Sequence, residues 1–193
     1  MDEQVLPDLL RLRGSVVTAS DEFFAAKENL IKPNAPVFAP ETYGAKGQVY
    51  DGWETRRRRG SGGTLPDLGA RDWVIVRLGV PGVVHSIVVD TAFFTGNHPH
   101  ACSADACSVS GYPSPGELAA DEAPGNSSWR EIVPRALLTG DARHAFKVNS
   151  GRRFTHVRLN IFPDGGVARL HVHGEVVPDP AMLEGLTIDL GAL

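Results

Sequence analysis

The stretch from residue 154 to residue 174 constrains the fold of this chain more than any other. It reads FTHVRLNIFPDGGVARLHVHG. On both sides of its Pro-Asp-Gly-Gly centre, apolar residues alternate with polar ones, and a period of two is that of a β-strand that buries one face. Pro163 fixes φ, and Gly165 and Gly166 tolerate positive φ, so the centre is expected to be a turn. The pattern predicts two strands joined by a turn, with the following side chains buried: Val157, Leu159, Ile161, Leu170 and Val172.

The opposite faces of these two strands are polar. Asn160, Asp164 and Arg169 are the kinds of residue that a small polar ligand requires, while His156 and Arg158 share the face of Asn160. Antiparallel sheets commonly leave one face in water. The spacing alone therefore favours an ordinary solvated face over a binding site, and both interpretations remain open at this point.

Composition places the chain among globular proteins of one domain. It has 193 residues, of which 42% are hydrophobic and 22% charged, and its net charge is −4. The negative charge argues against a general nucleic-acid-binding protein. No apolar run approaches the ~18 residues of a membrane span. The N-terminus, MDEQVLPDLLRLRG, is acidic where a signal peptide would be basic, which predicts a cytoplasmic protein.

No cofactor or metal is expected. Cys102 and Cys107 are separated by five positions. On one strand they would face opposite ways, which opposes a disulfide, and there is no second cysteine pair for zinc. His98 and His100 have the spacing of a chelate, but Pro99 restricts their geometry and no third ligand is apparent. The sequence also lacks a phosphate-binding loop and a dinucleotide fingerprint.

Further short strands follow the same logic. They are expected at residues 15–19, 73–78, 83–90, 101–110, 129–133 and 145–148. The sequence Gly79-Val80-Pro81-Gly82 is expected to be a turn between two of these strands, and residues 33–40 and 111–127 are expected to be loops. Many short strands with frequent turn signals and almost no helical period predict an all-β sandwich.

One loop region carries a concentration of polar residues beside an aromatic one. Asp51-Gly52-Trp53-Glu54 suits either a site loop or a surface turn anchored by Trp53. Arg56 would suit a bidentate contact with a carboxylate. The three arginines after it precede Gly-Ser-Gly-Gly and are expected to form a solvated, mobile edge.

Two levels of resemblance sharpen these predictions. WVIVRLG at residues 73–79, together with a closing strand that ends in glycine, resembles the galactose-binding or discoidin-like jelly rolls. Four stretches in order resemble the allantoicase (allantoate amidinohydrolase) family: DEFFAAKENLI at 21–31, DGWETR at 51–56, TAFFTGNHP at 91–99 and THVRLNIFPDGGVARL at 155–170. The resemblance implies a jelly-roll β-sandwich and hydrolysis of allantoate to ureidoglycolate and urea in purine (allantoin) catabolism.

Members of that family carry two similar repeats, whereas this sequence shows one. The resemblance implies a lead-in at residues 1–13, a jelly-roll domain at 14–176 and a tail at 177–193. Residues 188–193 (IDLGAL) echo residues 6–10 (LPDLL), so the tail resembles the start of a second repeat. The chain is then either a fragment or a true single-repeat variant, and its expected partners are allantoate and a second copy or a second repeat.

The reaction implied by the resemblance sets the chemistry of the expected site. Allantoate carries one carboxylate and two ureido groups on one carbon, so the site needs a cation, amide-like groups and an acid–base pair. Expected catalytic residues are Glu54 with Asp51 or Asp164, and His156 as another base. Expected substrate-binding residues are Arg56 or Arg169 for the carboxylate, Asn97 and Asn160 for the ureido groups, and Trp53.

We expect residues 51–56, Asn97 and residues 160–169 to converge at one end of the sandwich, because loops at strand ends commonly carry function. Two alternatives stay open: a non-catalytic ligand-binding jelly-roll module, and an inactive half of a two-repeat enzyme.

Overall fold

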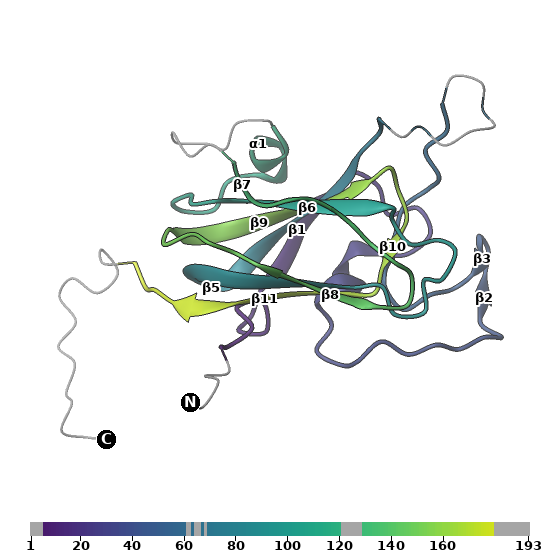
Figure 1. Cartoon of the computed structure of the whole chain (residues 1–193), viewed down its shortest axis with the longest axis horizontal. Helices are drawn as coiled ribbons and strands as arrows, with labels where there is room; N and C mark the ends of the chain where they lie inside the picture. Colours follow the sequence, from purple (N-terminus) through teal and green to yellow (C-terminus); the bar gives the residue numbers. More distant parts are fainter. Residues whose placement is uncertain (1–5, 61–62, 64–66, 68, 121–128, 180–193) are drawn as a thin grey trace.

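The chain folds as a jelly-roll β-sandwich. The computed structural model describes residues 6–60, 63, 67, 69–120 and 129–179. One layer has the strand order β1-β5-β9-β6-β7, and the second half of β5 pairs with β11 and β8 (Figure 1). The main strands are β1 (Ser15–Ala19), β5 (Asp72–Asp90), β6 (Ala101–Cys107), β7 (Arg130–Leu137), β8 (Arg143–Lys147), β9 (Arg153–Phe162) and β11 (Arg169–Val176).

Shorter elements lie in the connections. They are the 3₁₀ helix η1 (Lys27–Ile31), β2 (Tyr43–Gly44), β3 (Gly47–Gln48), β4 (Trp53–Glu54), α1 (Pro115–Ala119) and β10 (Gly166–Val167). β2 pairs with β3, and β4 pairs with β10. No helix in the described part of the chain has the length and hydropathy needed to cross a membrane.

The five side chains expected in the core are all buried, each with 0% exposure. This confirms the prediction from the period-two pattern. They pack between the layers with Trp53, Val74, Val76 and Ile87, and also with Leu9 from the segment before β1. Removing apolar area of this kind from water is the main term that stabilises such a domain.

β9 and β11 do not pair with each other as the two arms of a hairpin. β9 pairs with β5 from Asp72 to Val83, whereas β11 pairs with β5 from Gly82 to Asp90. The turn at residues 163–165 therefore carries the chain from one layer to the other, and the Phe162–Pro163 peptide bond within it is cis. The alternation predicted which face is buried but did not identify the strand alongside.

The expected turn at residues 79–82 is wrong, because β5 runs without a break from Asp72 to Asp90. Both glycines permit close backbone approach instead. A Cβ on Gly79 would lie 1.8 Å from the carbonyl oxygen of Leu12, and a Cβ on Gly82 would lie 2.2 Å from that of Glu175. The pairing of β5 with β9 shifts between Arg77 and Gly82, where the strand passes from one layer to the other.

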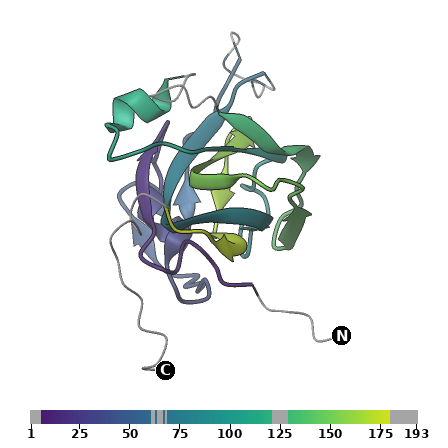
Figure 2. The same ribbon diagram turned by 90° about the vertical axis from the view of Figure 1, so that its left-hand side faces the viewer.

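The polar face of β9 is not solvated, which corrects the interpretation that spacing alone favoured. His156, Arg158 and Asn160 are 2%, 7% and 2% exposed. A second apolar cluster lies on this outer face, and it includes Leu118 of α1 and the partly buried Trp129. Figure 2 shows α1 on the outside of the sandwich, beside β1.

α1 itself lies in a stretch that was expected to be only loop. Its N-terminus is a capping box, in which Ser114 Oγ accepts from the Glu117 N–H and the Glu117 carboxylate accepts from the Ser114 N–H. The Ser-x-x-Glu spacing is the sequence signal for this start, and Pro115 stands at a favourable first position. The three prolines and three glycines of the stretch obscured it.

The two cysteines lie on opposite faces of β6. Cys102 belongs to the main core and Cys107 to the outer cluster, and both are free thiols. Burial raises the pKa of each to about 12, so both thiols stay protonated at neutral pH.

Candidate functional site

Three segments meet where β9 ends and the chain crosses between layers. The Thr55 N–H donates to the Gly165 carbonyl (3.1 Å), and the Gly165 N–H donates to Thr55 Oγ1 (3.1 Å). The Gly166 N–H donates to the Asn97 carbonyl (2.8 Å). These bonds join the loops after β4 and β5 to the 163–166 turn, although the three segments lie far apart in sequence.

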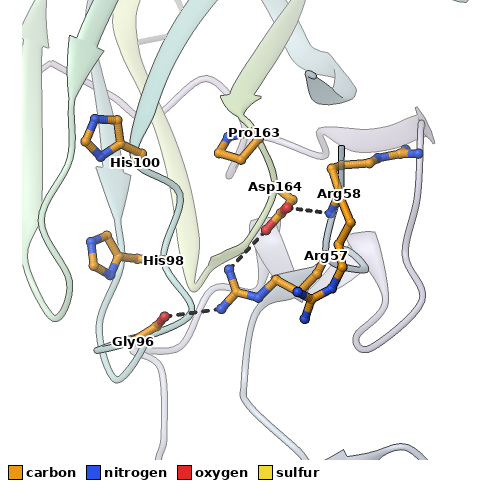
Figure 3. A pocket seen from close by; sticks show the side chains of 8 residues that line it. Arg57, Arg58, Gly96, His98, His100, Pro163 and Asp164 are labelled. Atoms are coloured by element: carbon orange, nitrogen blue, oxygen red, sulfur yellow. Dashed lines mark hydrogen bonds and ion pairs between the residues drawn. The ribbon is translucent and has the colours of Figure 1, made fainter. Parts of the chain in front are cut away.

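Asp164 is the centre of an ion-pair network in this turn, and its side chain is only 2% exposed. Its Oδ1 accepts from Arg57 Nη1 (3.0 Å) and its Oδ2 from the Arg58 N–H (2.6 Å). Arg57 Nη2 donates to the Gly96 carbonyl (3.2 Å), which ties the third segment in (Figure 3). Arg58 makes two further bonds to the carboxylate of Asp72, at 3.2 and 2.5 Å.

The arginine run is mostly exposed, as the sequence suggested, but Arg57 and Arg58 are fixed in place by ion pairs. Arg57 and Arg58 are held by Asp164 and Asp72, both of which are buried. The sequence missed these two residues because four adjacent arginines look alike, and Asp72 gave no signal beyond its place at the start of a strand. The bidentate fork of arginine suits such carboxylate pairs.

A pocket of about 540 Å³ opens beside this network. Figure 3 shows Arg57, Arg58 and Asp164 on one side of it, and His98 and His100 on the other. Arg59, Gly96 and Pro163 complete the lining. Arg57 is the residue of interest here, because 45% of its side chain remains exposed while its ion pair fixes its position.

Glu54 is not among the residues that line this pocket, but it interacts electrostatically with Arg57 and Asp164, which do line it. The surroundings of Glu54 shift its equilibrium toward the protonated form. The residue is 9% exposed, and its Oε1 accepts from Asn97 Nδ2 (2.9 Å). Burial raises the pKa of Glu54 and the charge of Asp164 raises it further, whereas the Asn97 hydrogen bond and the Arg57 charge oppose the rise. A carboxyl group whose pKa moves toward neutrality is suited to give and take a proton.

Asp51 and Arg169 form a different kind of pair close by. Arg169 is 1% exposed, and it donates to the carbonyls of Asn34, Asp51 and Ala168 and to Asp51 Oδ2 (2.6 Å). Asp51 also accepts from Lys32 Nζ and from the Val37 N–H. Burial alone would raise the pKa of Asp51, but these donors outweigh it and hold it at about 2.

The remaining expected site residues lie in other surroundings. Trp53 is fully buried, and its indole N–H donates to the Asp21 carbonyl (2.8 Å). Arg56 pairs with Asp21 (2.6 Å). On the outer face of the sheet, Asn160 Nδ2 of β9 donates to Ser103 and Asp105 of the neighbouring strand β6. His156 lies near the other end of β9, and burial, with a contribution from the charge of Arg77, lowers its pKa to about 4.

The structure thus brings Glu54, Asn97 and Asp164 together, and it joins Asp51 to Arg169. The side chains of Asn160 and His156 do not contact either group. Sequence reasoning missed Arg57, Arg58, His98 and His100 as pocket residues. The signal for His98 and His100 was their proximity to Asn97 in the TAFFTGNHP stretch, whereas their metal-like spacing drew attention elsewhere.

One cluster with metal-ligand chemistry occurs among the described residues, and it consists of Asp8, His171 and His173. Asp8 Oδ1 accepts from the N–H groups of Leu10 and Val172, and Oδ2 contacts His171 Nδ1 (2.8 Å). Arg11 Nε also lies 3.3 Å from Asp8 Oδ2. These contacts fasten the N-terminal segment to β11, and the nearby guanidinium opposes a second cation.

Comparison with known proteins places these observations in a family. The family model described as Allantoicase repeat matches residues 8–177. A "Probable allantoicase" from Nocardia farcinica (strain IFM 10152) is 53% identical over 190 residues, which cover 97% of this chain and 54% of the relative. A "Probable allantoicase" from Streptomyces coelicolor is 52% identical over 186 residues, which cover 95% of this chain and 48% of the relative.

Solved structures agree with the sequence comparison. The crystal structure of allantoicase from Saccharomyces cerevisiae has a TM-score of 0.71 at 35% identity, covering 93% of this chain and 51% of that one. The C-terminal domain of a chitobiase from Bacteroides fragilis has a TM-score of 0.55 at 18% identity, covers 89% of this chain and 99% of that one, and shows the shared fold alone.

The chain spans about half the length of the curated relatives it matches. Over that half, the match includes the three segments that meet at the 163–166 turn. By sequence identity, by the family model and by structure, the chain belongs to the allantoicase family.

Proposed function

We propose that the site at the 163–166 turn hydrolyses allantoate to ureidoglycolate and urea, a step of purine (allantoin) catabolism. The observation that carries the proposal is Glu54: a nearly buried carboxyl group, bonded to Asn97, with a raised pKa. Its electrostatic partners Arg57 and Asp164 line the pocket of about 540 Å³. Membership of the allantoicase family supports the choice of substrate.

In this proposal Arg57 binds the substrate carboxylate. Its guanidinium is half-exposed, and Asp164 and the Gly96 carbonyl fix it in place. Asn97 donates from Nδ2 to the Glu54 carboxyl, and its side-chain Oδ1 is available to accept from a ureido N–H. A group fixed before the substrate arrives loses little entropy on binding, which is the advantage of such positioning.

Glu54 acts as the proton carrier. In its protonated form it gives the proton to the departing ureido nitrogen, and the electron pair of the broken C–N bond leaves with urea. The oxygen of a water molecule forms the new C–O bond, and the proton of that water returns to the Glu54 carboxylate. The sum is allantoate plus water giving ureidoglycolate plus urea, with Glu54 regenerated.

The other expected residues support the site in this proposal. Asp164 positions Arg57, and the pair of Asp51 and Arg169 holds the 51–56 loop. Trp53 and Arg56 anchor the same loop to Asp21. The bonds of Asn160 and the remote position of His156 favour structural roles for both.

The test is urea release from the purified chain given allantoate. Glu54→Gln should lower turnover by roughly 100- to 10,000-fold, because the amide keeps the shape but cannot carry the proton. Glu131→Gln, an exposed change on β7, is the matched control and should match the unchanged chain. Full activity in Glu54→Gln removes Glu54 from the chemistry. No urea release from the unchanged chain contradicts the proposal and favours an inactive half of a longer enzyme.

A partner repeat or a second copy is part of this proposal. Several large apolar side chains are exposed before and within β2 and after β5, with 66% exposure for Val37, 39% for Phe38, 71% for Tyr43 and 36% for Phe93. Phe38 stacks on both Tyr50 and Phe93. Exposed apolar surface of this kind favours self-association or a second repeat. Light scattering at micromolar concentration should show a species larger than a monomer, and a monomer would count against this part.

A further inference from the structure

A second pocket, of about 390 Å³, lies near the start of β9. Arg77, Arg153 and His156 line it, and it is separate from the site described above. His156 and Phe162 are six positions apart on β9, which at about 3.3 Å per residue puts the two pockets roughly 20 Å apart along the strand. Nothing in the proposed hydrolysis of allantoate uses this pocket.

Arg77 is the central feature of this second pocket. It pairs with His156 across β5 and β9, so both side chains lie on the outer face of the sheet. Its guanidinium carbon lies 4.7 Å from the centre of the Tyr112 ring. Among the described residues it has no carboxylate or hydrogen-bond partner. A guanidinium stacked on an aromatic ring keeps its in-plane N–H donors free for a carboxylate.

The other polar groups set the charge that the pocket accepts. Arg153 Nε donates to the Val177 carbonyl (2.8 Å), and its Nη2 lies 3.7 Å from Asp179 Oδ2. His156 is bonded through Nδ1 to Thr155 Oγ1 (2.9 Å) and is neutral at pH 7. Among the described lining residues, two arginines and one aspartate leave a single positive charge, which matches a monoanion.

The remaining walls are mainly apolar, with Ser110 and Thr155 as the further polar residues of the lining. The apolar residues include Leu78, Val80, Pro81, Val109, Val176 and Pro178. A pocket of mainly apolar lining with a few convergent polar groups is the usual form of a small-molecule site. We infer that this pocket binds a small organic monocarboxylate with an apolar body, its carboxylate on Arg77 and its body against the apolar walls.

Benzoate is the probe that tests this inference, with calorimetric titration and amide chemical shifts as readouts. Benzoate should bind saturably and shift the amides of Arg77, Ser110 and Tyr112, whereas benzamide, which has the same shape without the charge, should not bind. Arg77→Gln should weaken benzoate binding roughly tenfold or more, because a charge-assisted pair is lost. Arg130→Gln, an exposed change on β7, is the matched control and should bind benzoate as the unchanged chain does.

Tyr112→Ala provides an independent variant, because Tyr112 is 84% exposed and its truncation leaves the core untouched. It should weaken benzoate binding several-fold by releasing the Arg77 guanidinium. Glu54→Gln should bind benzoate normally, which separates this inference from the proposed hydrolysis. The inference is overturned if benzoate does not bind saturably. It is also overturned if Arg77→Gln and Tyr112→Ala both bind benzoate as tightly as the unchanged chain does. If allantoate saturates this pocket and benzoate does not, the inference that the ligand has an apolar body is wrong.

Discussion

Asp51 and Glu54 are only three positions apart, just before and within β4, yet their surroundings shift their pKa values in opposite directions. Asp51 accepts from two cations, Arg169 and Lys32, and from a backbone N–H, and its pKa falls to about 2. Glu54 accepts from the neutral amide of Asn97 and is more deeply covered, and its pKa rises. Burial penalises both anions, more strongly for Glu54, and the charged donors of Asp51 outweigh that penalty whereas the single amide donor of Glu54 does not.

The difference separates a carboxylate that holds structure from one that suits chemistry. A group pinned as an anion by charged donors exchanges its proton only in acid, whereas one with a raised pKa is closer to exchange at working pH. Sequence position alone could not distinguish them, since both were expected to serve as acid or base.

The largest expected effect comes from breaking the structural pair. Asp51→Ala leaves the Arg169 guanidinium buried without its carboxylate, and we expect a loss of about 3–5 kcal/mol in the free energy of unfolding. Urea denaturation measures it. Glu41→Ala is the matched control, because this side chain is exposed, and it should change stability by less than about 0.5 kcal/mol. Equal stability of the two variants would remove the structural role assigned to Asp51.

A more conservative substitution tests the pair of Asp51 and Arg169 from the arginine side. Arg169→Lys keeps the charge but cannot supply the fork that bonds Asp51, Asn34 and Ala168 together. We expect a loss of about 1–3 kcal/mol in unfolding free energy, from donors and acceptors left unpaired. A lysine variant as stable as the unchanged chain would show that charge alone holds the loop.

The smallest expected effect is on the pH dependence of stability. Because the folded pKa of Asp51 is lowered, its stabilisation is present above the unfolded value of 3.8 and is lost as pH falls toward about 2. This amounts to roughly 2 kcal/mol. The pKa of Glu54 is raised, so its contribution is present below 4.5 and is lost as pH rises through the folded pKa.

Unfolding curves from pH 2 to 7 for two amide variants measure these contributions. Asp51→Asn should lack the acid loss, and Glu54→Gln should lack the loss at higher pH. Two variants with parallel pH profiles would contradict the comparison.

Much of the fold could be predicted from the sequence, because a strand with one buried face shows a local alternation of apolar and polar residues. The alternation around residues 163–166 predicted five buried side chains, and all five are buried. It could not identify the neighbouring strand, since β9 and β11 lie against successive halves of β5. The prediction of a turn at Gly79 and Gly82 was wrong for a related reason. Glycine occurs both in turns and where two backbones approach closely, and only the tertiary contacts distinguish these cases.

The site was less accessible from sequence, because its members are brought together by long-range packing. The stretches that resemble allantoicase drew attention to Glu54, Asn97 and Asp164. Nothing local distinguished Arg57 from its three neighbours, because its partner Asp164 lies 107 positions away. Leu118 of α1 and Trp129, which contacts Arg158, lie on a face of the sheet that the alternation presented as solvated.

The most direct test of the contrast between the two carboxylates is an NMR titration of their side-chain carboxyl carbons. Glu54 should titrate above the ordinary glutamate value of 4.5, and Asp51 should titrate at about 2. Asn97→Ala should raise the Glu54 midpoint further, because the Asn97 hydrogen bond favours the charged form. A Glu54 midpoint at or below 4.5, or an Asp51 midpoint at its ordinary 3.8, would contradict the division between a structural and a chemical carboxylate.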